Sequence, residues 1–247
     1  MEEKPTILVP IEVLEGESIP EGVPALLANA HVVLLGYHVL PDQTSTDQAR
    51  AQFEDQALTR LDEYASLLED AGAAVDSRLV FTHDSQQTMD RVIAEHDCLA
   101  VLLPNAISSL DEILVAVRGV VGIDRFVRLL TGLFASTEVS ITLYHITAAD
   151  ETDEDAKTLL DGIRSRIGEE GIDSDSIEFR IERKDDAQTA LQEAATDFDV
   201  VVMGESDPSV KTFVFGMPAE QIAKRYLGPV LVVQREKHDE TDEEADE

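Results

Sequence analysis

The sequence predicts an α/β protein made of two tandem units, each an open parallel sheet with helices on its faces. Short segments rich in Val, Ile and Leu alternate with longer segments of helical periodicity along the 247 residues, as in successive strand–helix–strand crossovers. Apolar residues amount to 43% and aromatic residues to only 5%, a composition typical of a buried parallel sheet. Within each unit we expect right-handed crossovers and the strand order 3-2-1-4-5.

The first half of the chain contains alternating predicted strands and helices. The longest helix has apolar residues at helical spacing and ends at Gly72, a residue type that commonly follows a helix C-terminus. Asp84 can cap the next helix. In chain order we expect a strand at 7–12, a helix at 24–30, a strand at 31–40, a helix at 47–71, a strand at 75–81, a helix at 85–96 and a strand at 98–103.

The second half repeats this order and adds a loop, a helix and a fifth strand. Gly171 ends one helix as Gly72 does, and Pro218 stands at the first position of the last helix, where proline is favoured. We expect strands at 112–117, 138–146, 177–181, 198–203 and 230–234, helices at 122–136, 153–170, 186–196 and 218–227, and a loop at 204–216.

Two short motifs recur at nearly the same offset in the two halves. Ile7-Leu8-Val9 matches Ile113-Leu114-Val115, and Tyr37-His38-Val39 matches Tyr144-His145-Ile146. Coincidences in the same element order indicate a tandem duplication. Only eight residues lie between Pro104 and Ile113, so the first copy lacks the loop, the last helix and the fifth strand of the second.

These observations divide the chain into three parts. We expect a truncated domain at 1–108, a complete domain at 109–235 and a disordered acidic tail at 236–247, which has few apolar residues. The tail is interpreted as a solubilising extension rather than a docking peptide. The fifth strand is expected to lie at a sheet edge and to need a partner, which predicts a homodimer joined through Pro229 to Gln234.

The net charge excludes several classes of partner. The chain has 51 Asp and Glu against 19 Lys and Arg, giving a formal charge of −32. Nucleic acid and anionic membrane surfaces are therefore excluded as partners, because both require a basic surface. Such an excess of acids is typical of a protein adapted to very high salt, where ions screen the repulsion. The alternative is an ordinary acidic cytosolic protein.

The chain shows neither a targeting signal nor a transmembrane segment. Its start, Met-Glu-Glu-Lys-Pro, is unlike a signal peptide, and charged residues interrupt its longest apolar stretch, residues 113–135. We therefore expect a soluble cytoplasmic protein. The single cysteine, Cys98, lies in an apolar run and is expected to be a buried, inert thiol without a disulfide or metal.

A ligand site in such a fold is expected where the strand order reverses. Ligands of open parallel sheets bind at the carboxyl ends of the strands beside this switch point. In the second unit the predicted order brings Val117-Arg118 next to Met203-Gly204. In the first unit it brings Ile11-Glu12 next to Leu103-Pro104.

Several segments at these positions resemble landmarks of the universal stress protein (UspA-like) family. They are Ile7-Leu-Val-Pro-Ile-Glu12, Leu35-Gly-Tyr-His-Val39, Val201-Val-Met-Gly204, Phe215-Gly-Met-Pro-Ala-Glu-Gln-Ile222 and Gly228-Pro-Val-Leu-Val-Val233. The resemblance covers nearly the whole chain. It implies an adenine nucleotide alpha hydrolase-like fold in two tandem domains that pack as a pseudo-dimer, with the first domain truncated.

The resemblance also implies what an ATP site of this family contains. Family members that bind ATP have a loop with Gly, two residues, Gly, nine residues, Gly, then Ser or Thr. Its glycines let backbone N–H groups approach phosphate oxygens, and its hydroxyl lies at a helix N-terminus. An Asp at the end of the first strand holds the ribose.

The present chain departs from this pattern. Gly204 is kept, but Asp207 stands in place of the second glycine, Gly216 comes one residue early and Met217 replaces the hydroxyl. Arg118 replaces the Asp of the first strand. The first copy keeps a carboxylate there, Glu12, but has no glycine loop. Neither half therefore has the complete set of residues that binds a nucleotide in this family.

No cofactor is therefore expected, with ATP or AMP as a possible ligand of a degenerate site. Glu205 and Asp207 place negative charge where phosphates would lie, opposed by Lys211. If a nucleotide binds, the expected residues are Val117, Arg118, Ile146, Met203, Gly204, Ser206, Asp207, Lys211, Gly216 and Met217.

The remaining polar candidates have ordinary structural interpretations. His38 and His145 end matching strands and are interpreted as structural, because no Cys, Asp or Glu stands beside either at ligand spacing. The basic residues Arg118, Arg125 and Arg128 form either an anion site or surface ion pairs. The hydroxyls of the last loop, Ser206, Ser209 and Thr212, lack the pattern of a nucleophile. No enzyme is predicted, and no metal site.

The sequence thus predicts a non-catalytic regulatory module of the universal stress protein kind that acts through protein contacts. A transporter or another cytosolic protein is a possible partner. The alternative is a sensor that binds ATP or AMP at the Gly204 loop. A weaker alternative is a nucleotide hydrolase or nucleotidyl transferase of the same architecture.

Overall fold

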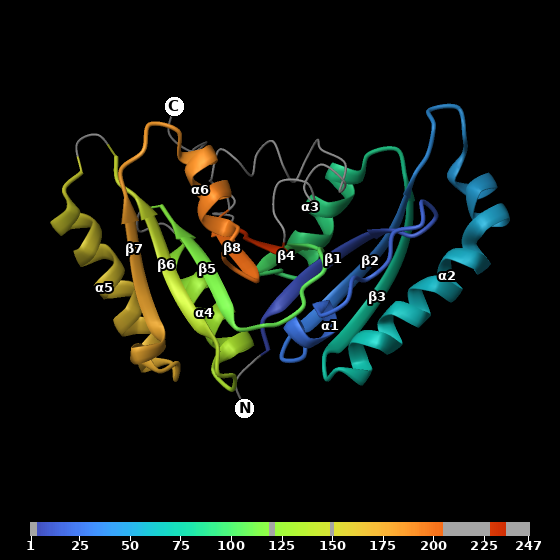
Figure 1. The fold of residues 1–247 in the computed structure, drawn as a ribbon. Coiled ribbons are helices and arrows are strands. Elements are labelled where there is room, and N and C mark those ends of the chain that lie inside the picture. Colours follow the sequence, from blue (N-terminus) through green and yellow to red (C-terminus); the bar gives the residue numbers. More distant parts are fainter. Residues whose placement is uncertain (1–3, 119–121, 149–150, 205–227, 236–247) are drawn as a thin grey trace, which may run out of the picture.

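The computed structural model describes residues 4–118, 122–148, 151–204 and 228–235. Its strands form one nine-stranded sheet in the order β3-β2-β1-β4-β9-β8-β5-β6-β7. Neighbouring strands are parallel except for β4 and β9, which are antiparallel. The two halves of the chain therefore build one continuous sheet, with the long helices α2 and α5 at its two outer ends (Figure 1).

The first half consists of four strands and three helices. These are β1 (Thr6–Glu12), α1 (Val23–Leu26), β2 (His31–Val39), α2 (Thr46–Asp70), β3 (Ala74–Thr82), α3 (Ser85–Glu95) and β4 (Ala100–Leu103). The expected helix signals are confirmed: the Asp84 side chain accepts a hydrogen bond from Gln87 N at 2.9 Å, and Gly72 has a left-handed φ of 112°.

The second half repeats this order and contributes one further strand. Its elements are β5 (Glu112–Val117), α4 (Ile123–Phe134), β6 (Ser140–Ile146), α5 (Asp153–Glu169), a 3-10 turn (Ser174–Ser176), β7 (Ile177–Glu182), α6 (Ala187–Ala195), β8 (Val200–Gly204) and β9 (Val230–Val233). The expected loop at 204–216 beyond Gly204, the helix at 218–227 and the acidic tail at 236–247 lie outside the described residues.

Helices cover both faces of the sheet. On one face, α1, α2, α4 and α5 pack over alternate strand residues in a single apolar core that runs through both halves. On the other face α3 covers the first half and α6 the second, each over its own smaller cluster. Because both faces are covered, the inner strands are buried and apolar almost throughout, whereas the edge strands β3 and β7 are partly exposed and polar.

The halves are also joined by polar contacts. Arg125 of α4 is buried and donates from Nη2 to the backbone oxygen of Cys98 at 2.7 Å, while its Nη1 lies 3.4 Å from the Asp97 carboxylate. Asn29 donates to the backbone oxygen of Leu133 at 3.0 Å. Cys98 itself is buried as expected, and burial raises the pKa of its thiol to about 12.

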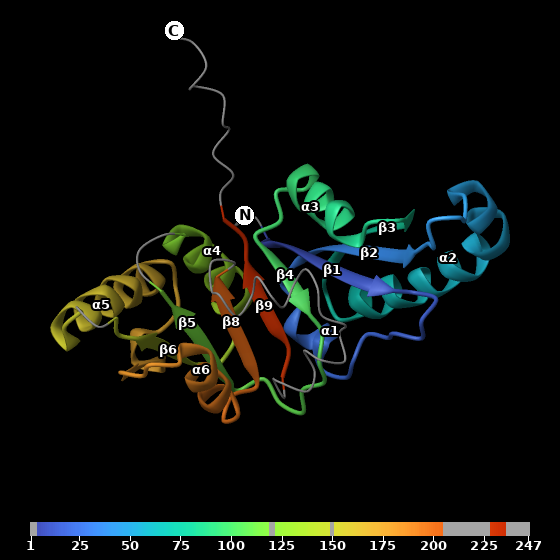
Figure 2. The same ribbon diagram turned by 90° about the horizontal axis from the view of Figure 1, so that it is seen from above.

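The expectation that the last strand lies at a sheet edge is wrong. β9 pairs in parallel with β8 on one side and antiparallel with β4 on the other (Figure 2). The first half lacks a fifth strand, so the free edge of β4 is where β9 can pair within the same chain. The backbone groups through which we expected a homodimer at Pro229 to Gln234 are thus used inside the chain.

Within the described residues no helix combines the length and the apolar character needed to cross a bilayer.

Candidate functional site

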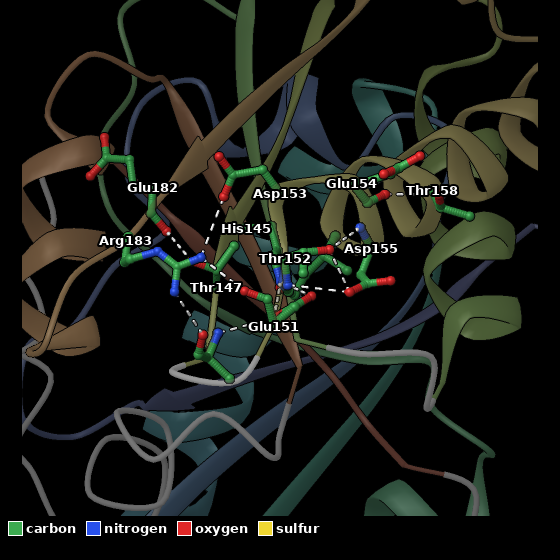
Figure 3. A network of polar contacts seen from close by, with 12 residues as sticks. His145, Thr147, Glu151, Thr152, Asp153, Glu154, Asp155, Thr158, Glu182 and Arg183 are labelled. Atoms are coloured by element: carbon green, nitrogen blue, oxygen red, sulfur yellow. Dashed lines mark hydrogen bonds and ion pairs between the residues drawn. The ribbon is translucent and has the colours of Figure 1, made fainter.

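A pocket of about 700 Å³ opens at the carboxyl ends of β5, β6 and β7. This is the side of a parallel sheet where ligands bind. The polar network beside the pocket is drawn in Figure 3. Among the described residues, the pocket is lined by Arg118, His145, Ile146, Thr147, Ala148, Glu151, Arg183, Lys184, Asp185 and Ala187.

His145 is the buried residue at the centre of this network. Its Nδ1 lies 2.8 Å from the backbone oxygen of Val117, and its Nε2 lies 2.9 and 3.0 Å from the two carboxylate oxygens of Glu151. A carbonyl and an ionised carboxylate only accept hydrogen bonds, so this arrangement is satisfied by an imidazolium that donates from both nitrogens.

Glu151 is the ionised partner of this pair. Partial burial acts to raise the pKa of its carboxyl group, but the backbone N–H of Ala148 and the His145 ring outweigh burial and lower the pKa below its ordinary value of 4.5. The Ala148 N–H donates to Oε2 of Glu151 at 3.0 Å. The result is a carboxylate held between two donors.

Arg183, directly after β7, contacts Ala148 and Glu151, two described residues between β6 and α5. Its guanidinium donates to the backbone oxygens of Ala148 at 3.3 Å and Glu151 at 2.8 Å (Figure 3). The Thr147 N–H donates to the backbone oxygen of Glu182 at 2.9 Å. A capping box formed by Thr152 and Asp155 then begins α5. This wall of the pocket is therefore held at both of its ends.

The pocket concentrates positive charge in a strongly acidic protein. Arg118, Arg183 and Lys184 line it, together with the His145 ring, against the carboxylates of Glu151 and Asp185, and Asp153 pairs with Arg183 at 3.4 Å. The whole chain has 51 acidic against 19 basic residues. A local excess of cations in such a chain favours an anionic ligand, which the surrounding surface repels.

A narrow apolar crevice adjoins the charged pocket. It is lined by Ala116, Val117, Tyr144, Ile146 and Leu191. Arg118, Ile146 and Ala187 line both the crevice and the pocket. The crevice encloses only about 10 Å³, the room of one water, so a ligand of the charged pocket would meet these apolar side chains only at the shared residues.

The structure brings together three of the residues predicted for the site. Val117, Arg118 and Ile146 lie at the pocket and its crevice. Met203 is buried in the cluster under α6, and Gly204 lies toward α4, because a Cβ there would be 3.6 Å from the Phe126 ring. The predicted residues Ser206, Asp207, Lys211, Gly216 and Met217 lie outside the described residues.

Sequence reasoning missed Arg183, Lys184, Thr147 and Glu151. A usable signal existed for the first two, since an Arg-Lys pair directly after a predicted strand is unusual in so acidic a chain. The interpretation of His145 as structural agrees with its contacts, but the statement that no acid stands near it is wrong: Glu151, six residues on, binds its ring.

The expected basic cluster does not form as one group. Arg118 lies at the pocket, Arg125 is buried against the first half, and Arg128 is exposed on α4. Arg125 and Arg128 are only three residues apart on α4 and so lie on neighbouring positions of the helix, but Arg125 is turned toward Asp97 of the first half and Arg128 toward solvent. For Arg125 the ion-pair interpretation holds, with Asp97 as partner.

The lowered pKa of Glu151 predicts a pH-dependent contribution to stability. Glu151→Gln should lower the free energy of unfolding by about 1.5 kcal/mol at neutral pH, since a hydrogen bond to a charged group is lost. A depressed carboxyl pKa gives stability that is present above 4.5 and lost as the pH falls below it. The gap between the two proteins should therefore close in acid.

Urea unfolding of both proteins between pH 7 and pH 3 measures this gap. Glu178→Gln, at an exposed position of β7, is the matched control and should show a small gap at every pH. A gap for Glu151→Gln that persists unchanged at pH 3 would contradict the ionised His145–Glu151 pair.

Comparisons with known proteins bear on the fold. No protein-family model and no curated protein matches the chain. The fold is similar to that of a universal stress protein from Archaeoglobus fulgidus DSM 4304, with a TM-score of 0.56 and 16% identity over 93% of this chain and 96% of that one. At this identity the likeness concerns the fold alone, and it confirms the expected α/β class with an open, mostly parallel sheet.

Two weaker similarities fall below a TM-score of 0.5 and support no argument. One is to the universal stress protein from Archaeoglobus fulgidus in complex with dAMP (TM-score 0.38, 20% identity, 50% of this chain and 97% of that one). The other is to a putative universal stress protein from Pseudomonas aeruginosa UCBPP-PA14 (TM-score 0.43, 17% identity, 95% and 94%).

Proposed function

We propose that this chain is a non-catalytic regulatory module of the universal stress protein kind that binds a small anionic ligand in its second half. The observation that carries the proposal is the pocket with three basic side chains, Arg118, Arg183 and Lys184, in a chain of formal charge −32. Its volume of about 700 Å³ lies in the range of small-molecule sites.

A nucleoside monophosphate fits the pocket better than a triphosphate. The pocket of about 700 Å³ has room for a base beside Ile146 and Ala187, and its basic residues suit one phosphate dianion. A triphosphate would extend further and need more donors, whereas the loop after Gly204 begins with Glu205 and has Asp207 in place of a glycine. We therefore propose a ligand of the AMP type.

The polar groups of the described pocket support binding rather than turnover. Both nitrogens of His145 are engaged with Val117 and Glu151, so the ring is not available as a base. The hydroxyl of Thr147 is directed to the backbone oxygen of Glu182 at 3.4 Å. We propose that ligand occupancy alters contacts with a protein partner, a transporter or a cytosolic protein being the candidates.

Calorimetry with AMP, ATP and adenosine tests the proposal, at the lowest KCl concentration that keeps the native circular dichroism. We expect AMP to bind more tightly than either of the others. Lys184→Gln should weaken AMP binding about tenfold, the loss of one charge-assisted contact. Lys157→Gln, an exposed lysine of α5 outside the pocket, should leave the affinity unchanged.

Two results would overturn this assignment. Equal affinities of the Lys184 and Lys157 variants would show that AMP does not use this pocket. Steady release of phosphate or adenosine from AMP over hours, lost in Lys184→Gln, would show that the protein is an enzyme.

A further inference from the structure

The first half carries a cluster of opposite character at the matching end of its sheet. Glu12 ends β1, Glu15 lies in the turn that follows, and His38 lies near the end of β2. One ligand atom from each of these side chains lies within 4.8 Å of the other two. The cluster thus offers one imidazole nitrogen and two carboxylate oxygens at the carboxyl edge of two paired strands.

The histidines of the two halves occupy matching positions but have different partners. Tyr37-His38-Val39 corresponds to Tyr144-His145-Ile146. His145 uses both ring nitrogens on Val117 and Glu151. The Nδ1 atom of His38 is buried and has no hydrogen-bond partner within the described parts of the chain. A buried nitrogen without a partner is unfavourable, which favours a bound group that uses this imidazole.

The imidazole of His38 is held in place by its neighbours. The rings of Phe53 and Phe81 each lie with their centroids 6.2 Å from that of His38, at interplanar angles of 60° and 79°. These contacts restrict the ring, so it is oriented before any ligand arrives. A preoriented nitrogen lowers the entropic penalty of binding.

The surroundings of the cluster are negative. The carboxylates of Glu15 and Glu17 lie close enough to that of Glu12 to repel its charge. Glu17 is tied to the same turn, because its carboxylate accepts from the Glu12 N–H at 2.6 Å. Arg60 reaches this region but donates to the backbone oxygen of Val13 at 2.9 Å. A cation among these carboxylates would relieve their mutual repulsion.

We propose that Glu12, Glu15 and His38 bind a divalent transition-metal ion. An imidazole together with two carboxylates suits Zn²⁺, Co²⁺ or Ni²⁺, whereas Mg²⁺ and Ca²⁺ prefer oxygen ligands alone. Metal–ligand bonds of about 2.1 Å place ligand atoms roughly 3–4 Å apart, and the atoms of this cluster lie within 4.8 Å of one another. Glu15 is exposed, so its side chain can turn inward to close the site.

This site is independent of the anion pocket, since it lies in the other half of the sheet and uses other side chains. Glu12 in the first half and Arg118 in the second half occupy matching positions. On these proposals Glu12 contacts a cation and Arg118 contacts an anion. Failure of AMP to bind would not contradict the metal site, and failure of a metal to bind would not contradict the anion pocket.

Zinc calorimetry in a large excess of Mg²⁺ tests the site, because Mg²⁺ occupies weak carboxylate sites on the acidic surface. We expect one Zn²⁺ per chain with micromolar affinity. Glu15→Gln and His38→Gln should each weaken it at least tenfold. The matched controls, Glu21→Gln and His96→Gln, change residues of the same types outside the cluster and should leave it unchanged.

Cobalt binding to the unmodified protein provides a measurement that does not depend on variants that fold. Co²⁺ should shift the ring protons of His38 in the proton NMR spectrum before those of the other histidines. Equal zinc affinity of Glu15→Gln and Glu21→Gln would overturn the proposal. So would zinc binding that Mg²⁺ removes entirely, or a first cobalt shift at another histidine.

Discussion

Replacing Leu231 with alanine is expected to lower the free energy of unfolding by about 3–4 kcal/mol, the range for a fully buried leucine. Leu231 lies in β9 and is fully buried. It is paired with Leu102 of β4 on one side and with Val202 of β8 on the other. The substitution therefore leaves a cavity at the strand that joins the two halves of the sheet.

Leu67→Ala is the matched control, because Leu67 of α2 is 45% exposed and should contribute less than about 0.5 kcal/mol. Urea denaturation at two protein concentrations measures both variants. Similar losses at the two positions would contradict a central β9. A loss at Leu231 that grows on dilution would instead place β9 between two chains, as the sequence alone suggested.

The elements were predictable because their signals are local. Apolar periodicity located the strands and helices of the described segments, and Gly72 and Gly171 have the left-handed φ of 112° and 108° that helix ends require. These signals use residues within a few positions of one another. The strand order 3-2-1-4 expected for each unit is also observed in both halves, but the joining of the two units in one sheet was not predicted.

The partner of β9 was missed because strand pairing is not local. The sequence indicated an unpaired fifth strand in the second half and the lack of one in the first half. Those two open edges complement each other, and pairing within one chain avoids the loss of translational freedom on dimerisation. The homodimer was predicted because the open edge of the second half was considered without the open edge of the first half.

The site was predictable only in part for the same reason. Val117, Arg118 and Ile146 follow from the strand order, which sets the carboxyl edge. Arg183 and Glu151 come from segments whose approach depends on how the connection after β6 folds. Glu151 contacts the His145 ring, and both Glu151 and Arg183 contact backbone groups of Ala148. Residue spacing does not predict these contacts.

Gly228→Ala is expected to destabilise the protein by about 3 kcal/mol, because overpacking against backbone cannot be relieved by a rotamer change. A Cβ at Gly228 would overlap the backbone oxygen of Asp199 and lie 2.9 Å from its carbonyl carbon. Asp199 cannot easily move, since its carboxylate accepts from the N–H groups of Asp111 and Glu112 at 2.9 and 3.0 Å.

The same substitution at Gly162 should have the opposite effect on stability. Gly162 lies inside α5, and a Cβ there meets nothing within 4 Å, so Gly162→Ala should stabilise the protein by about 0.5–1 kcal/mol through helix propensity. Thermal and urea unfolding of the two variants check both signs. Stabilisation by Gly228→Ala would contradict the close contact between β8 and the start of β9. Destabilisation by Gly162→Ala would instead indicate a contact on the outer face of α5, since a helical alanine on a bare surface is favourable in itself.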